Sequence, residues 1–427
     1  MAPSIVESQD ASPPSGDKFK VIVVGAGIAG LLTAIGLRLD DHNVAILEQS
    51  STFGEVGAGM RIPPNSFKIL HRWGIDLTYM KKTYSNGNRF LRYDTGNIIA
   101  DMPHGVPEWD FGGSYLSVHR ADYHNVLLNK AIEVGVDIRK DSRVDEYDWE
   151  TPSALLSDGT RVDGDLIVVA DGVQSAARPI FQGHEMPPVD TGDIVYRVLI
   201  PGQELLSDPD LRDLISQPWV SSWCGPDAHV IGYPIRGGET YNVVYCCSAH
   251  SVQDEELEEG ETKRIFKNNA ELVRRFAGWE PRVRKLVDLT NSTFLKWRLY
   301  DLDMVEHWVH SSNKGVLVGD AVHPMLPYMA SGAAMAGEDA ATLRKLIQGA
   351  THKTLPAALA KYQKLRQPRA STVQKAGRAL QDAYHLPDGP AQQERDEWMV
   401  KDDARNPIFW GHKERRQWLF GHDAERF

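Results

Sequence analysis

Val21-Ile-Val-Val-Gly25-Ala-Gly27-Ile-Ala-Gly30 is the stretch of this 427-residue chain that decides its fold. Its first four residues are apolar and mostly β-branched, which is typical of a buried strand. The three glycines allow a tight turn, a close approach of a pyrophosphate to the backbone, and close packing of the next helix on the strand. We predict that this helix spans residues 28–39 and that its N-terminus faces the phosphates.

An acidic residue follows at the spacing that a dinucleotide site requires. Residues 43–47 predict a second buried strand, and Glu48 comes directly after it. A carboxylate in this place accepts hydrogen bonds from the two hydroxyl groups of a ribose. Strand, glycine turn, helix, strand and acid in this order predict a Rossmann-like nucleotide-binding unit rather than a glycine-rich turn without a ligand.

Two more strand-to-loop junctions carry polar residues. Residues 166–170 predict a buried strand that ends at Asp171-Gly172, and residues 315–320 predict another that ends at Asp320. The helix start Ser331-Gly332-Ala333 then consists of small residues, which let a ligand approach the backbone. Ligands of open α/β sheets bind at the carboxyl ends of strands, so we expect all three junctions to serve one nucleotide cofactor.

The composition is ordinary for a soluble enzyme. Hydrophobic residues make up 42% of the chain and charged residues 25%, and the net charge is −11 without a long basic run, which argues against a nucleic-acid partner. Cys224, Cys246 and Cys247 form no CxxC pair, so the sequence predicts neither a disulfide framework nor a metal site. We find no signal peptide and no apolar run of about 20 residues, and we expect a cytoplasmic protein that does not bind membranes.

These motifs resemble those of the class A, single-component FAD-dependent aromatic monooxygenases. The chain is most similar in pattern to salicylate hydroxylase, 6-hydroxynicotinate 3-monooxygenase and the fungal dearomatising polyketide hydroxylases, and the similarity runs from Val21 to about Arg378. Further motifs that carry it are Gly57-Ala-Gly59-Met-Arg61-Ile-Pro-Pro-Asn65 beside the flavin, His119-Arg120, Gly319-Asp320-Ala-Val-His323-Pro and Glu338-Asp339. The resemblance assigns tight, non-covalent FAD binding to Gly25, Gly27, Gly30, Glu48, Gly59, Arg61, Arg120, Asp171, Asp320, Gly332 and Ala333.

The resemblance also implies an α/β fold, in which a Rossmann-like FAD-binding domain carries an inserted antiparallel β-sheet domain and a helical C-terminal region. We assign residues 18–185 and 295–350 to the FAD-binding domain and residues 186–294 to the substrate-binding sheet. Residues 351–427 form C-terminal helices and an aromatic tail. Residues 1–17 are polar and rich in Ser and Pro, and we read them as a disordered tail.

The middle of the chain is expected to form the floor of the substrate site. Residues 193–200, 219–224, 229–233 and 241–247 read as antiparallel strands. In the dearomatising relatives an Arg and a Tyr on the corresponding strands hold the substrate phenolate, and the resemblance places Arg197 and Tyr233 there. From the residues alone, Arg197 equally suits an ion pair on a strand face, and Tyr233 suits a packed edge aromatic. Pro327 is expected to shield the reacting oxygen from water.

Two residues keep more than one interpretation at this stage. Arg61 stands where the family more often has an uncharged residue, and it lies over the flavin, reaches a substrate anion or forms a surface ion pair. His323 either relays a proton or holds its loop by a hydrogen bond, and the structural role is the more common one.

The reaction that the resemblance implies is hydroxylation of a phenolic or aromatic small molecule, such as a fungal secondary metabolite. NAD(P)H reduces FAD, O2 adds to form a flavin C4a-hydroperoxide, and the substrate takes one oxygen atom. The product is a catechol, a decarboxylated hydroxyarene or a dearomatised dienone. Epoxidation of an alkene or indole on the same scaffold is the alternative, and a non-enzymatic binding protein on a similar fold is a second one.

The C-terminal region is expected to be helical. Residues 338–347 and 355–383 predict long helices, with Arg366 and Arg369 on exposed turns. A charged tail rich in aromatic residues follows, with Trp398, Phe409, Trp410, Trp418 and Phe420. These aromatic residues either clamp onto the FAD-binding domain, form a dimer contact or touch a membrane surface, although the mixed charge argues against the last. The sequence is compatible with a monomer or a homodimer.

Overall fold

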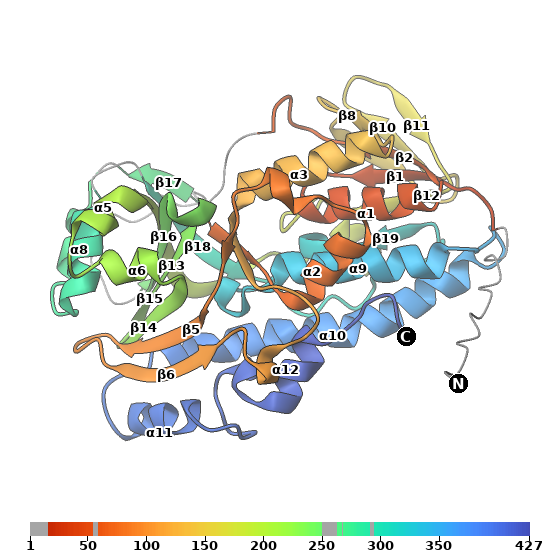
Figure 1. The fold of residues 1–427 in the computed structure, drawn as a ribbon. Helices are drawn as coiled ribbons and strands as arrows, with labels where there is room; N and C mark the ends of the chain where they lie inside the picture. The colour runs from red at the N-terminus through yellow and green to blue at the C-terminus, as the bar shows by residue number, and fades with distance from the viewer. Residues whose placement is uncertain (1–15, 54–58, 250–262, 267, 291–293) are drawn as a thin grey trace, which may run out of the picture.

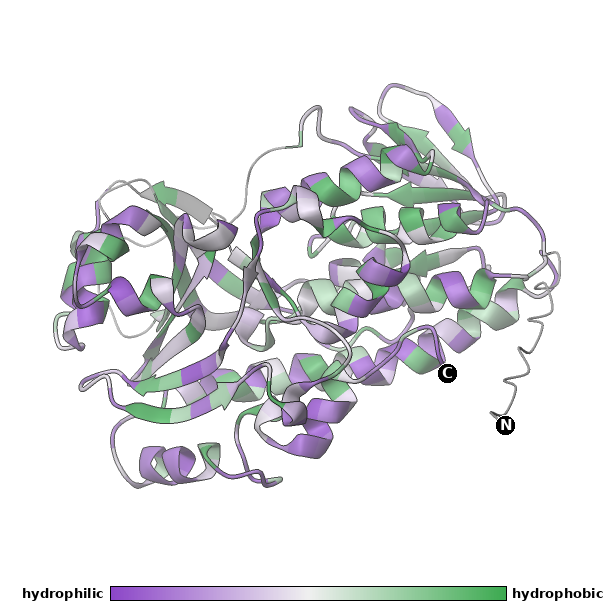
Figure 2. Ribbon diagram, viewed as in Figure 1, coloured by the Kyte–Doolittle hydropathy of each residue, from purple (hydrophilic) through white to green (hydrophobic). Residues whose placement is uncertain are grey.

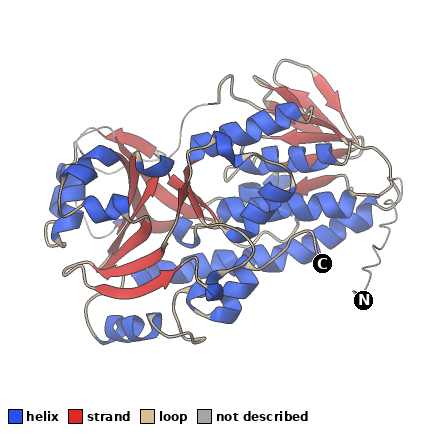
Figure 3. Cartoon of the chain, in the orientation of Figure 1, coloured by secondary structure: helices blue, strands red, loops and turns tan. Residues whose placement is uncertain are grey.

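The computed structural model describes residues 16–53, 59–249, 263–266, 268–290 and 294–427. It is a mixed α/β structure in which two large sheets lie side by side and helices cover them (Figures 1 and 3). Residues 1–15 of the expected tail lie outside this part of the chain. Asp17 lies inside it, and its backbone N–H donates to the carbonyl of Ala350 at 2.8 Å.

The first sheet is parallel and begins with the glycine-rich motif. Its order is β19 (Gly315–Leu317), β12 (Leu166–Val169), β1 (Lys20–Val24), β2 (Asn43–Leu47) and β8 (Asp137–Arg139). Register pairs such as Val21 with Leu166 and Val168 with Val316 align the carboxyl ends of β1, β12 and β19. The three junctions predicted to share one cofactor therefore end at one edge of one sheet.

Helices pack on the parallel sheet because its strands are apolar on both faces (Figure 2). Helix α1 (Ile28–Leu39) contacts β1 and β2 directly, α3 (Arg120–Glu133) and α9 (Gly332–Ile347) pack against α1, and α2 (Pro64–Arg72) packs against α9. Helix α4 (Arg178–Gln182) contributes Phe181 to the same core. Helix α1 packs directly against α9, so the N-terminal ends of both approach the same region. A small antiparallel sheet of β9 (Val144–Asp148), β10 (Ser153–Leu156) and β11 (Arg161–Asp163) lies at one end.

The second large sheet has eight strands. Its order is β17 (Lys263–Phe266), β18 (Phe294–Asp301), β13 (Val189–Pro201), β16 (Thr240–Ser248), β15 (Ala228–Ile235), β14 (Trp219–Gly225), β5 (Gly87–Arg92) and β6 (Ile98–Pro103). The four antiparallel strands predicted in the middle of the chain are confirmed as β13 to β16. Short helices cover its outer face: α5 (Gly202–Ser207), α6 (Arg212–Ser216), α7 (Ala270–Arg275) and α8 (Pro281–Asp288).

Two strands of the eight-stranded sheet come from the segment that the sequence analysis assigned to the FAD-binding domain. Strand β5 pairs in parallel with β14, with Trp219 opposite Gly87, and β6 pairs with β5. Residues 87–103 thus belong structurally with the second sheet. The domain boundaries remain a prediction, and this pairing refines them.

A second small sheet lies between the two large ones. It consists of β3 (Gly59–Ile62), β7 (Leu116–His119) and β4 (Thr83–Tyr84). The long helix α10 (Leu355–Tyr384) runs beneath both large sheets (Figure 1). Helices α11 (Pro390–Met399) and α12 (Lys413–Phe420) follow it. No helix among the described residues has the length and apolar character needed to cross a bilayer.

Candidate active site

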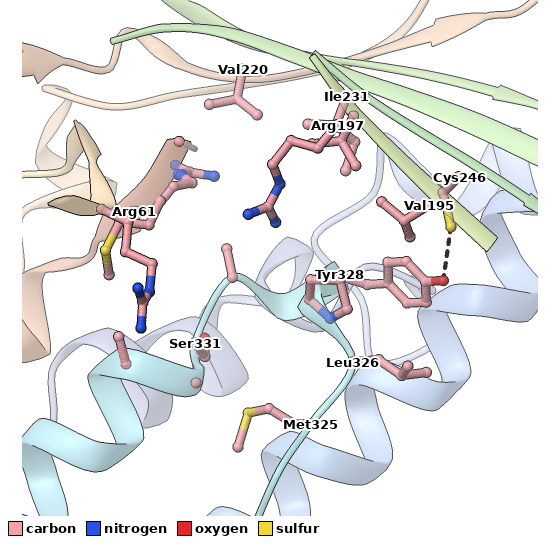
Figure 4. A pocket seen from close by; sticks show the side chains of 18 of the residues that line it. Arg61, Val195, Arg197, Val220, Ile231, Cys246, Met325, Leu326, Tyr328 and Ser331 are labelled. Atoms are coloured by element: carbon pink, nitrogen blue, oxygen red, sulfur yellow. Dashed lines mark hydrogen bonds between the residues drawn. The ribbon is translucent and has the colours of Figure 1, made fainter. Parts of the chain in front are cut away.

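A cavity of about 450 Å³ lies where the carboxyl edge of the parallel sheet meets the eight-stranded sheet. Its wall includes the starts of α1 and α9, strand β3, the inner face of β13 to β16, and the turn before α9. Figure 4 shows Arg197 extending into this space from the sheet, with Arg61 across from it. Residues separated by hundreds of positions in the sequence therefore surround one cavity.

The glycine turn leaves room for a ligand at the start of α1. Gly25 has φ +100°, which favours glycine, and a Cβ at Gly30 would lie 1.9 Å from the carbonyl oxygen of Gly25. Gly27 lines the cavity, and a Cβ there would meet nothing within 4 Å. The start of α1 has no side-chain cap and no acidic residue in its first turn. Its backbone N–H groups are thus available to an anion.

Glu48 lies at the end of β2, beside this turn. One of its carboxylate oxygens accepts from Ala26 N at 2.8 Å, and the other accepts from Ser50 N at 2.8 Å. The side chain therefore holds the turn in place. Its predicted contact with a ribose is not tested by this arrangement and stays a prediction.

The other predicted acids and Arg120 surround the same edge. Arg120 is the first residue of α3 and lines the cavity. Asp320, in the loop after β19, also lines the cavity. The pKa of the Asp320 carboxyl is raised, because the surrounding protein desolvates it. The charge of His323 opposes this shift without reversing it. One oxygen of Asp171 accepts from Ala176 N at 3.1 Å, and the other is buried without a partner among the described residues. That oxygen can accept a hydrogen bond from a ligand.

The second helix start also faces the cavity. Gly332 and Ala333 are the first residues of α9 and line the wall, and the N-cap residue Ser331 makes no capping hydrogen bond. The start of α9 thus offers a second set of free backbone N–H groups.

A buried ionic network fixes the loop that carries Asp320. Asp339 accepts from Gly319 N at 2.9 Å and contacts His323 Nε2 at 2.6 Å. Arg366 donates to Asp339 at 2.8 Å and to Glu338 at 2.6 Å. His323 therefore holds its loop, which favours the structural interpretation over a proton relay.

The exposed position predicted for Arg366 and Arg369 is wrong. Arg366 is 1% exposed and Arg369 is 6% exposed. Arg369 donates to both carboxylate oxygens of Glu338, at 2.6 and 2.7 Å. Buried carboxylates on α9 need cations from the helix packed against them, and residue type alone does not reveal that pairing.

Gly59 and Arg61 lie on β3, while Gly57 and Ala58 of the same motif lie outside the described residues. Gly59 N donates to Asn242 at 2.8 Å, and a Cβ there would come within 2.6 Å of the Tyr233 ring. Arg61 donates to Asn88 at 2.6 Å, and no carboxylate partner of Arg61 is found among the described residues. Its Nε and Nη2 atoms are buried without a partner, which excludes a surface ion pair.

Arg197 and Tyr233 reach the cavity from β13 and β15. Arg197 forms no ion pair within the described part of the chain, and its guanidinium lies 4.9 Å from the centre of the Trp297 ring. The pKa of Arg197 is lowered by burial, and the nearby Tyr233 hydroxyl offsets only part of that shift. The pKa of Tyr233 is raised by burial, and the charges of Arg197 and Arg61 offset only part of it. The strand-face ion pair considered for Arg197 is therefore not found in the part of the chain that the structure describes.

Pro327 begins the short turn Pro327–Met329 and lines the cavity. Its neighbours Met325 and Leu326 line the same wall. On its other side, this apolar loop packs against α10, on which Gly377 faces Leu326. The arrangement is compatible with the predicted shielding role.

The C-terminal tail folds back onto the domain, as one of the three alternatives predicted. Trp410 and Phe420 are each 5% exposed, and Trp410 lines the cavity. The centres of the Phe420 and Tyr115 rings lie 4.9 Å apart. Arg72 binds both oxygens of Asp423, at 2.9 and 2.7 Å. The sequence did not predict that Trp410 lines the cavity, because no local pattern indicates where a tail docks.

Comparisons with known proteins agree with this geometry. Residues 18–376 match the FAD binding domain family. The chain is 34% identical to the FAD-dependent monooxygenase OpS4 of Beauveria bassiana (strain ARSEF 2860), over 96% of both chains. It is 30% identical to a 3-hydroxybenzoate 6-hydroxylase of Klebsiella oxytoca, over 94% of this chain and 96% of the relative.

The chain belongs to the family of FAD-dependent monooxygenases. Solved structures show the same fold. CtdE in complex with FAD and a substrate superposes with a TM-score of 0.80 at 22% identity, over 96% of both chains. A salicylate hydroxylase substrate complex superposes with a TM-score of 0.77 at 24% identity, over 95% of this chain and 96% of the other. The predicted family, fold class and cofactor are confirmed.

The residues around the cavity fit FAD on structural grounds. Two uncapped helix starts face one cavity, and Gly27 leaves open space where a phosphate would approach the backbone. The unpartnered oxygen of Asp171 and the accessible carboxylate of Asp320 supply acceptors for cofactor hydroxyl groups. The individual roles of these residues remain predictions.

Proposed function

We propose that this FAD-dependent monooxygenase uses NAD(P)H and O2 to hydroxylate a phenolic small molecule in the cytoplasm. FAD would supply the redox chemistry, taking electrons from NAD(P)H and activating O2. The protein would supply binding, orientation and charge. The named activity of the 3-hydroxybenzoate 6-hydroxylase relative supports an aromatic substrate.

The observation that carries the proposal is the half-buried guanidinium of Arg197 in the cavity, which has no carboxylate partner among the described residues. A cation that is partly withdrawn from water and lacks a carboxylate partner favours an anionic ligand, because the anion offsets the cost of desolvating the charge. A phenolate meets this requirement, and the nearby cation lowers the pKa of the phenol that forms it. The Tyr233 hydroxyl, on the neighbouring part of the wall, would donate a charge-assisted hydrogen bond to the same oxygen.

A second cation favours an anionic substrate over an alkene. Arg61 reaches the same cavity and likewise lacks a carboxylate partner among the described residues. Epoxidation needs no phenolate, and an Arg197 that pointed away from the cavity would have favoured it. The orientation of Arg197 supports hydroxylation instead.

The apolar loop at Pro327 would keep water from the reacting oxygen. Met325, Leu326 and Pro327 line the cavity together, and Trp410 of the tail lines another part of its wall. The protein would therefore bind the phenolate beside the flavin, hold its charge with Arg197 and exclude bulk water. The ring carbon ortho to the phenolate oxygen is then the nucleophile.

Stopped-flow reduction of the bound flavin tests this function. The FAD-loaded protein is mixed with NADH or NADPH, alone and with a panel of phenols, non-phenolic arenes and alkenes. We expect phenols to accelerate reduction and to yield hydroxylated products with O2. Acceleration and product formation with alkenes or indoles, and none with phenols, would favour the epoxidase instead.

A further inference from the structure

Several hydrogen-bond donors beside the cavity have no acceptor. A narrow side pocket adjoins the cavity, since Arg61, Asn88 and Trp410 line both spaces, and Tyr115 lines the side pocket as well. Two nitrogens of Arg61, the hydroxyl of Tyr115 and the indole nitrogen of Trp410 are buried, and none has a hydrogen-bond partner among the described residues. Because buried polar groups are normally paired, this set of donors indicates a binding site.

The donors come from three segments that the fold brings together. Arg61 lies on β3, which pairs with β7, and Tyr115 directly precedes β7. The Arg61 guanidinium lies 5.4 Å from the centre of the Tyr115 ring. Trp410 belongs to the C-terminal tail, and its carbonyl accepts from Arg416 at 3.0 Å. The site is therefore complete only with the tail docked.

The Arg61 guanidinium is held at one edge and is unpaired at the other. Its Nη1 donates to Asn88 Oδ1 at 2.6 Å, and Asn88 Nδ2 lies 3.3 Å from His104 Nε2. The unpartnered atoms are Nε and Nη2, which lie on the same edge of the planar group. Two parallel N–H groups of a guanidinium match the two oxygens of a carboxylate. The free edge of Arg61 is therefore suited to a carboxylate.

The charge of the site also favours an anion. Burial lowers the pKa of His104 to about 3, with the charge of Arg61 as a second cause, so His104 is neutral at physiological pH. Arginine remains a cation in this range, and the indole N–H of Trp410 can only donate. The site thus offers one positive charge and several donors without a negative group to balance them.

The size of the side pocket limits what can enter it. Its volume of about 10 Å³ gives room for about one water-sized atom. One oxygen of a carboxylate fits there while the rest of the molecule stays in the main cavity. A phosphate group or an aromatic ring is too large for the side pocket.

The site lies across the cavity from Arg197, as Figure 4 shows. A molecule that contacts both arginines has an anionic group at each of two opposite ends.

We propose that Arg61, Tyr115 and Trp410 bind a carboxylate of the substrate itself, at the end remote from the phenolate, an inference that rests on the proposed function. It selects the contact with a substrate anion among the interpretations considered for Arg61. Nε and Nη2 of Arg61 bind the two oxygens, and Trp410 Nε1 donates to the oxygen in the side pocket. The substrate is then a phenol with a carboxyl group across the ring or on a short side chain. The ring carbon ortho to the phenolate carries no carboxyl group, so the product keeps it.

Equilibrium binding to the FAD-loaded protein, without NAD(P)H, tests the site. Flavin fluorescence gives the Kd of 4-hydroxyphenylacetate and that of 4-hydroxyphenylacetamide, two phenols that differ in charge and hardly in size. The ratio of the amide Kd to the acid Kd measures recognition of the carboxylate. Salicylate and salicylamide give the same ratio for a carboxyl group next to the phenol hydroxyl.

Three variants are compared with the native protein, and the FAD affinity of each is measured. Arg61→Gln removes the cation, and Trp410→Phe removes the indole N–H and keeps an aromatic ring. Arg89→Gln is the matched control, because Arg89 pairs with Asp101 at 2.8 Å and does not line the cavity. It removes an equal charge from the same strand as Asn88.

In the native protein and in Arg89→Gln, we expect the acid to bind at least about tenfold more tightly than the amide, a factor that corresponds to about 1.4 kcal/mol. Arg61→Gln should bring this ratio close to one, with FAD affinity and the amide Kd as in the native protein. Trp410→Phe should lower the ratio by about threefold, since it removes one hydrogen bond. The salicylate ratio should be the same with and without Arg61. Added chloride should weaken binding of the acid to the native protein more than to Arg61→Gln.

Three results overturn the inference and leave the proposed function intact. A native ratio in Arg61→Gln would reject the subsite. Loss of FAD from Arg61→Gln, with acid and amide weakened equally, would assign Arg61 to the cofactor. Chloride that tightens amide binding in the native protein and not in Arg61→Gln would assign the site to a free anion. If the native protein binds none of the four phenols, phenol recognition itself is wrong, and the proposed function fails with the subsite.

Discussion

Replacing Arg366 with Met should destabilise the protein and weaken FAD binding together. Arg366 is 1% exposed and donates to Glu338, to Asp339 and to the carbonyl of Met335. Methionine keeps most of the volume and removes the charge. Both carboxylates then stay buried with one cation fewer, although Arg369 still binds Glu338.

The size of the effect follows from the number of charges left without a partner. Breaking a buried ion pair by removing one partner costs about 3–5 kcal/mol. An unfolding entropy of about 2.1 cal/mol/K per residue gives about 0.9 kcal/mol/K for a chain of 427 residues that unfolds cooperatively. The unfolding temperature should therefore fall by about 3–6 °C. Because Asp339 also binds Gly319 N beside Asp320, FAD affinity should fall as well.

Differential scanning calorimetry and FAD titration measure both effects. Arg161→Met is the control, since Arg161 is 52% exposed and pairs with surface carboxylates whose contribution is about 0–1 kcal/mol. An unfolding temperature in Arg366→Met that matches the control, with native FAD affinity, would refute the claim that this network supports the cofactor loop.

Three further outcomes are expected. Asp320→Ala should release FAD, since each lost charged hydrogen bond costs about 1.5–3 kcal/mol; stoichiometric FAD in the purified variant would contradict this placement. Glu48→Ala should weaken FAD by a similar amount yet keep turnover at saturating FAD, and a fully loaded but inactive variant would argue against a site remote from the chemistry. Hydrogen bonds from Arg72 lower the pKa of Asp423 to about 2, so the stability that Asp423 contributes is present above pH 3.8 and lost as the pH falls towards 2. After a reduction for solvent screening, the free energy of unfolding of Asp423→Asn should be about 1–2 kcal/mol lower than that of the native protein at pH 7 and equal to it near pH 2. A difference that persists near pH 2 would count against this linkage.

Local patterns predicted the nucleotide-binding unit closely. The expected helix and second strand match α1 and β2 in their bounds, because strand, glycine turn and helix are adjacent in the sequence and each pattern is complete within a few residues. The four middle strands were predicted for the same reason. The helix start predicted at Ser331-Gly332-Ala333 is confirmed, since α9 begins at Gly332, and the long helix predicted over residues 338–347 is the rest of the same element.

What the sequence did not predict depends on contacts between distant residues. The burial of Arg366 follows from carboxylates on another helix, and the pairing of β5 with β14 joins segments more than 120 positions apart. His229 and His385 are separated by 156 residues and meet only because α10 ends beside β15. A hydrophobic pattern describes one element and its faces, and it carries no information on which element packs against it.

The ratio of hydroxylated product to NAD(P)H consumed, measured with H2O2 in the same reaction, tests the central claim most directly. Arg197→Ala removes the cation that holds the phenolate, while FAD, NAD(P)H and O2 still react. We predict that NAD(P)H consumption persists in part, that product falls by about 10²-fold or more, and that H2O2 accounts for the difference. Tyr233→Phe should show a milder form of the same uncoupling, because it removes one hydrogen bond and keeps the charge. Native coupling in Arg197→Ala would contradict the phenolate site and favour a substrate that needs no cation.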